Sequence, residues 1–231
     1  MHDHPHSSRG LLGSLGHELK AHAPFTLAGS LTGVVLMTIM FYARMPSEWS
    51  EILFDWVFHP AHVFLSAMVT AGIYRLRGRG GLVATLLVGY VGSIGIATLS
   101  DCVIPYVGES LLEVLHDCDA PHDHADHAVH AHVHAGFLEM WWLINPLALA
   151  GVGVAWFWPR TKCPHAGHVL LSTWASLFHF TMALGGHLDL LAVGVVTVFL
   201  FLAVWIPCCT SDIVFPVLFS GGPVCKQEDC Q

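Results

Sequence analysis

Charged residues are scarce in this 231-residue chain. Asp, Glu, Lys and Arg make up 11% of the sequence, whereas about 25% is typical of a soluble globular domain. Hydrophobic residues account for 54% and lie in long runs rather than at amphipathic spacing. This composition excludes an ordinary soluble domain. The expected partner is the lipid bilayer, and no nucleic-acid partner is expected.

Three further absences narrow the class of protein. The chain has no alternating strand pattern of the kind that predicts a membrane β-barrel. It has no Walker-type nucleotide motif, so ATP bound by this chain is not an expected energy source. The N-terminal residues also lack the continuous apolar core of a cleavable signal peptide.

Long apolar runs predict transmembrane helices. Each approaches the roughly 20 residues that a helix needs to cross about 30 Å of hydrocarbon. Helices are favoured because an unpaired backbone amide in lipid costs several kcal/mol. The expected fold is therefore an all-α polytopic membrane protein with six transmembrane helices. The predicted spans cover residues 25–43, 59–76, 81–104, 136–158, 165–186 and 188–210.

Basic residues predict the orientation of these spans. In a six-span arrangement only Arg44 falls on one side of the membrane. The other eight basic residues fall on the opposite side: Arg9, Lys20, Arg75, Arg77, Arg79, Arg160, Lys162 and Lys226. The positive-inside rule then predicts that both termini are cytoplasmic and that the loop between spans 3 and 4 is external.

Three short blocks recur in the same order along the chain. The recurring pairs are His22-Ala-Pro-Phe25 with His134-Ala-Gly-Phe137, His59-Pro-Ala-His62-Val-Phe-Leu-Ser66 with His165-Ala-Gly-His168-Val-Leu-Leu-Ser172, and Ser100-Asp101-Cys-Val-Ile-Pro105 with Ser211-Asp212-Ile-Val-Phe-Pro216. Each block keeps a His or an Asp, which indicates a duplicated polar or metal site rather than an accident of apolar composition.

The duplication predicts two inverted-topology repeats. Three crossings leave the chain on the opposite side of the membrane, so the second copy lies upside down relative to the first. Such repeats recur in secondary transporters. The predicted divisions are an N-terminal tail (1–24), repeat 1 (25–105), an external loop (106–135), repeat 2 (136–219) and a C-terminal tail (220–231).

The recurring side chains predict one metal site near each membrane face. The expected outer ligands are His59, His62, Asp101 and His134, and the expected inner ligands are His22, His165, His168 and Asp212. Imidazole and carboxylate ligands suit Zn²⁺ first, and then Ni, Co, Fe or Mn. Pro105 and Pro216 are expected to free backbone carbonyls beside each Asp. For any one of these residues, the simpler interpretation is an interfacial His or a helix-capping Asp.

Several other residues are candidate additions to these sites. The external loop carries His122, His124 and His127, which suit either a metal-collecting arm or a solvated linker. His179 lies nearly on the same helical face as His168, where it would be a ligand or a packing residue. Cys208 and Cys209 would be soft ligands, although buried Cys more often acts as a small apolar residue.

The leading hypothesis is a secondary transporter of a divalent transition metal, rather than an enzyme. One alternative is a membrane-embedded metalloenzyme or a haem protein, since His residues on neighbouring spans can hold a metal centre or ligate haem. Another is a metal-binding subunit of a larger membrane complex. The sequence is also compatible with a homo-oligomer.

Overall fold

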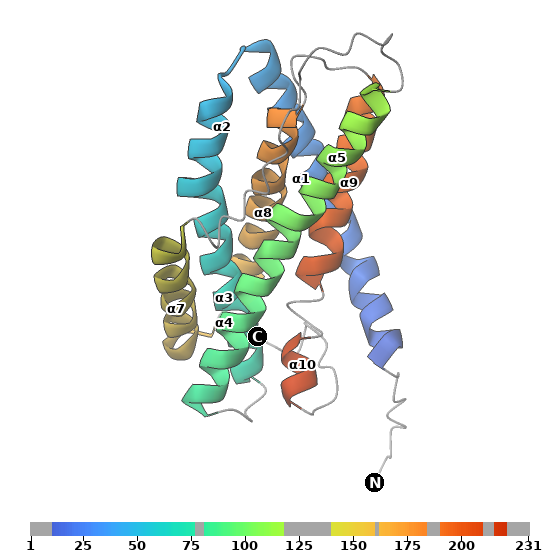
Figure 1. The fold of residues 1–231 in the computed structure, drawn as a ribbon. Coiled ribbons are helices and arrows are strands. Elements are labelled where there is room, and N and C mark those ends of the chain that lie inside the picture. Colours follow the sequence, from blue (N-terminus) through green and yellow to red (C-terminus); the bar gives the residue numbers. More distant parts are fainter. Residues whose placement is uncertain are drawn as a thin grey trace.

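The structure is a computed structural model that describes residues 11–76, 81–117, 140–159, 162–183, 190–209 and 215–220. These residues form a bundle of long helices, with no strand among them (Figure 1). The elements are α1 (Leu11–Tyr42), α2 (Ser47–Leu53), η1 (Phe54–Phe58), α3 (His59–Leu76), α4 (Leu82–Thr98), η2 (Leu99–Val103), α5 (Ile104–Asp117), α7 (Trp141–Phe157), α8 (Lys162–Ala183), α9 (Leu190–Cys209) and α10 (Phe215–Ser220). The predicted all-helical fold is confirmed for the described residues.

Two of the helical passes contain a π-helical turn. In η1 the His59 N–H donates to the Phe54 carbonyl, and in η2 the Ile104 N–H donates to the Leu99 carbonyl, five residues back in each case. A proline follows immediately, at Pro60 and at Pro105. Proline has no N–H, and its ring clashes with the carbonyl four residues earlier. The wider turn accommodates that ring, so each helix continues without a break.

Because these helices are continuous, their limits differ from those of the predicted spans. Residues 47–76 form one continuous helix through α2, η1 and α3, whereas the sequence predicted a span beginning at residue 59. The pass through α4, η2 and α5 continues to Asp117, so the first part of the predicted 106–135 loop is helical. Pro105 therefore lies within a continuous helical pass, because the π-turn accommodates its ring.

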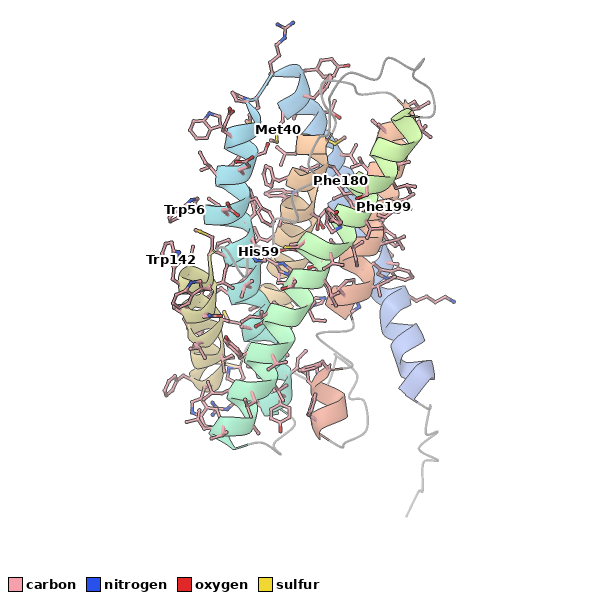
Figure 2. All side chains as sticks on the ribbon, viewed as in Figure 1. Met40, Trp56, His59, Trp142, Phe180 and Phe199 are labelled. Atoms are coloured by element: carbon pink, nitrogen blue, oxygen red, sulfur yellow. The ribbon has the colours of Figure 1, made fainter. Side chains whose placement is uncertain are left out.

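Four segments of the described chain are long and apolar enough to cross a membrane: His22–Tyr42, Glu48–Leu76, Leu82–Gly108 and Leu190–Cys208. Large apolar side chains also face outward, as at Leu31, Val35 and Ile39 on one side of α1. Trp56 and Trp142 lie together on the outer side of the bundle (Figure 2). These features are compatible with an integral membrane protein, in which lipid covers the apolar exterior.

Helix α3 lies against α4, α7 and α8, while α1 packs against α8 and α9. Small residues permit the closest approaches. A Cβ at Gly151 of α7 would collide with the Phe64 carbonyl of α3, and one at Gly89 of α4 would collide with Ala71. Close crossings at glycine are typical of membrane helices. On the α8 side of α3, a Cβ at Gly167 would lie 3.0 Å from the Leu65 side chain, so a small residue also permits this approach.

Candidate metal centre

Asp101 is the hub of a buried polar cluster. Its Oδ2 accepts hydrogen bonds from His59 Nδ1 at 3.0 Å and from His62 Nδ1 at 2.6 Å. Its Oδ1 accepts from the hydroxyls of Ser100 at 2.8 Å and Ser172 at 3.0 Å. All of these side chains are almost completely buried. Both carboxylate oxygens are therefore engaged by the protein.

This arrangement selects one tautomer of each histidine. An imidazole that donates from Nδ1 carries its lone pair on Nε2 when the ring is neutral. The Nε2 atoms of His59 and His62 are buried, and neither has a hydrogen-bond partner among the described residues. A carboxylate that holds Nδ1–H while Nε2 points elsewhere is the usual support of a metal-binding histidine.

The π-turn at η2 contributes to this cluster. Ile104 donates to Leu99, and the next residue, Pro105, has no N–H, so neither supplies a donor to the Ser100 carbonyl. The Ser176 hydroxyl of α8 reaches that carbonyl at 2.8 Å. Ser176 also donates to the Ser172 carbonyl at 2.9 Å. The Ser100 carbonyl, left without a backbone donor near Pro105 as the sequence predicted, thus links the turn that carries Asp101 to α8 through a hydrogen bond.

Three potential ligands, including His62 itself, converge beside this hydrogen-bonded cluster. The ligand atoms of His62 in α3, His168 in α8 and Cys208 in α9 all lie within 4.8 Å of one another. The three side chains are fully buried. The rings of His62 and His168 have centroids 5.2 Å apart. Two imidazoles that bind one Zn²⁺ through bonds of roughly 2.0–2.1 Å hold their centroids roughly 5 Å apart.

The row of imidazoles continues beyond His168. The centroids of His168 and His165 are 5.4 Å apart, and those of His165 and His22 are 4.7 Å apart. His168 is fully buried, His165 is 7% exposed, and His22 is half-buried. The row therefore runs from the buried interior toward the end of the bundle where α1 and α8 begin.

The structure brings six of the eight predicted ligands into one cluster: His22, His59, His62, Asp101, His165 and His168. The expectation that they form two groups at opposite faces differs from this arrangement. His62 is the central residue of the Glu48–Leu76 helix, not a residue at its outer end, because the helix begins twelve residues earlier than predicted. Figure 2 shows His59 near the middle of the bundle's length.

Other predicted site residues lie outside the described part of the chain. These are His134, Asp212, His122, His124 and His127, together with the side chains of His179 and Cys209. Of the two additional thiols predicted, Cys208 is described and belongs to the converging group.

Sequence reasoning missed the serines of this cluster. Ser172 and Ser100 both lie in the repeated blocks, opposite Ser66 and Ser211, so their recurrence was a usable signal. Ser66, the counterpart of Ser172, has a buried hydroxyl with no hydrogen-bond partner among the described residues. The role of Ser176 had no signal in the repeat, because it depends on the π-turn.

Comparisons with known proteins found no relative of this chain. No family model matches the chain, and neither the curated proteins nor the solved structures contain a significant match to it.

Proposed function

We propose that this protein is a secondary transporter of a divalent transition metal, with Zn²⁺ first and Co²⁺, Ni²⁺, Fe²⁺ or Mn²⁺ after it. The observation that carries the proposal is the buried group of His62, His168 and Cys208. Two imidazoles and a thiol form a donor set that suits Zn²⁺ and disfavours the hard cations Mg²⁺ and Ca²⁺.

The depth of this group supports transport. His62 is fourteen residues from each end of its 29-residue apolar helix, a distance of about 21 Å along the axis. A bilayer is about 40–45 Å thick including its headgroups, so the site would lie near the midplane. Polar and ionisable groups at that depth are costly and usually mark a substrate pathway.

The packing also supports the inverted repeat. In the proposed six-span arrangement, α1 corresponds to α7, the α3 pass to α8, and the α4 pass to α9. Helix α1 packs on α8 and α9, and its counterpart α7 packs on α3 and α4. The candidate site lies where α3 meets α8. Inverted-repeat transporters hold their substrates at such a junction, and alternating access follows when one repeat moves against the other.

In this proposal some residues of the cluster bind the metal ion, and Asp101 orients the histidine rings. His62, His168 and Cys208 bind the ion. Asp101 orients both imidazoles of α3 rather than binding metal, since its oxygens already accept four hydrogen bonds. Metal binding would release protons from the ligands, which allows a gradient to couple to transport.

Cobalt binding to the purified protein tests the site. Co²⁺ bound by a thiolate gives a ligand-to-metal charge-transfer absorption that imidazole ligands alone do not give. We expect this band in the native protein and its loss in Cys208→Ala. Cys102→Ala is the matched control, because Cys102 is equally buried but packs beside Met40 and Phe54. A band that survives in Cys208→Ala would remove this thiol from the site.

A further inference from the structure

We infer that His22 and His165 form a second, weaker metal site, which passes ions to and from the central group through His168. The inference rests on the proposed function and adds a route to it. It also assigns that route to one end of the molecule only.

The spacing of the rings supports stepwise transfer. Each neighbouring pair, His22 with His165, His165 with His168, and His168 with His62, has a centroid separation between 4.7 and 5.4 Å. One ion can be shared by two imidazoles at about this separation. Consecutive pairs also share a ring, so an ion can exchange one ligand at a time without full release.

The number and type of ligands change along the row. The His22–His165 pair offers two imidazoles at a partly exposed position, whereas the central group offers two imidazoles and a thiol in a fully buried one. Fewer and harder ligands bind a thiophilic ion less tightly, so the His22–His165 pair suits transient occupancy. Pathways work when each site binds strongly enough to fill and weakly enough to empty.

The row opens toward one end of the bundle. His22 is the first residue of the His22–Tyr42 apolar segment, and His165 lies in the first turn of α8. In Figure 1 the beginnings of α1 and α8 lie at the same end of the bundle.

At the opposite end of the polar cluster, apolar side chains pack against His59. The ring of Phe54 stacks on His59 with centroids 5.2 Å apart. Phe54 belongs to a buried cluster with Met40, Cys102, Ala175 and Phe178. This apolar packing at the His59 end favours entry of ions from the end that carries His22 and His165.

The rate of cobalt arrival at Cys208 tests the route. Full-length metal-free protein is mixed rapidly with Co²⁺, and growth of the thiolate charge-transfer band reports occupation of the central group. We expect His22→Ala and His165→Ala to slow this growth several-fold while the final amplitude stays close to native. Lys20→Ala is the control, because Lys20 is exposed on the same helix and offers no imidazole. His165→Gln repeats the test with a polar side chain of similar size.

The outcomes separate this inference from the function on which it rests. An unchanged rate in both His variants, with a normal band, would overturn the relay and leave the central site intact. A reduced final amplitude at an unchanged rate would also overturn it, because the two residues would then support the central group only structurally. Absence of the band in the native protein would reject both the central site and the relay.

Discussion

Asp101 joins the two halves of the chain at the level of single atoms. It accepts hydrogen bonds from His59, His62 and Ser100 of the first half and from Ser172 of the second. A buried carboxylate is stable only when such partners replace its lost hydration. The sequence identified Asp101 as a metal ligand, and the hydrogen bonds favour an orienting role instead.

Asp101→Asn tests that role. An amide offers one oxygen in place of two and adds an N–H₂ donor, so it cannot accept from both imidazoles and both serines. The histidine rings would lose their fixed orientation while the ligand atoms remained present. We expect metal affinity to fall about 10–100-fold, as for other groups that support ligands. Competition titration with a chelating dye measures this affinity.

Glu51→Gln is the control for Asp101→Asn, because Glu51 is an exposed carboxylate on the same helical pass as His62. Unchanged affinity in Asp101→Asn would show that the carboxylate does not position the ligands. Loss of the bound metal from the control variant as well would point to a general effect of charge.

At the scale of elements, the two π-turns place the site within continuous helices. Each turn precedes a proline, and each carries or adjoins a residue of the cluster, Asp101 in η2 and His59 just after η1. In η2 the turn also leaves the Ser100 carbonyl to Ser176. Widened turns of this kind often occur at functional sites.

Pro105→Ala tests the contribution of the η2 turn. Alanine restores a backbone N–H at position 105. This N–H can donate an ordinary α-helical hydrogen bond to the Asp101 carbonyl, or it can compete with the Ser176 hydroxyl for the Ser100 carbonyl. We expect weaker metal binding together with equal or greater thermal stability, measured by titration and by thermal unfolding.

The control for this element is Pro146→Ala, since Pro146 is an exposed proline inside α7. If Pro105→Ala retained native metal affinity, the turn would be a packing feature without a role at the site. A parallel loss in Pro146→Ala would show that any helical proline has the same effect.

The apolar runs predicted the helices well but their limits poorly. Glu48, Glu51 and Asp55 interrupt the hydrophobic pattern before His59, and Pro60 resembles a helix start, so the sequence placed the boundary near residue 59. The structure begins that helix at Ser47. A π-turn has no 3.6-residue signature, so no periodicity could reveal it. This earlier start places His62 at the centre of the Glu48–Leu76 helix rather than near its end.

The sequence predicted which residues share the buried cluster better than it predicted their grouping. The repeated blocks identified His59, His62, His165 and His168, because recurrence of the same polar residues marks them out. Cys208 was ambiguous, since a thiol in an apolar helix is usually a packing residue. Cys208 becomes a ligand candidate only because α3, α8 and α9 bring it close to His62 and His168. The positions at which helices cross cannot be predicted from one sequence.

At the scale of the whole molecule, the proposed topology predicts from which side of the membrane each end of the bundle is accessible. Basic residues predict that the end carrying Lys20 and Arg75 is cytoplasmic. The open end of the imidazole row is the same end. In a variant without native Cys, His165→Cys should react with a membrane-impermeant thiol reagent from the cytoplasmic side. Arg44→Cys, exposed at the opposite end, should react only from outside.

Labelling of both positions from one side would contradict the topology. Labelling of His165→Cys from outside, with Arg44→Cys labelled from inside, would keep the bundle but reverse its orientation. The metal-binding measurements are made on purified protein, so the sidedness test can fail separately from them.

The central claim is that the buried group carries metal across the membrane. Its most direct test is ion flux into proteoliposomes that contain the full-length protein, across a panel of divalent ions and in both gradient directions. We predict Zn²⁺ and Co²⁺ flux in the native protein and in Cys102→Ala, and its loss in Cys208→Ala and His168→Ala. Native flux in both of the latter variants would contradict the account. So would metal binding without flux of any ion, which fits a metal-binding subunit or an enzyme.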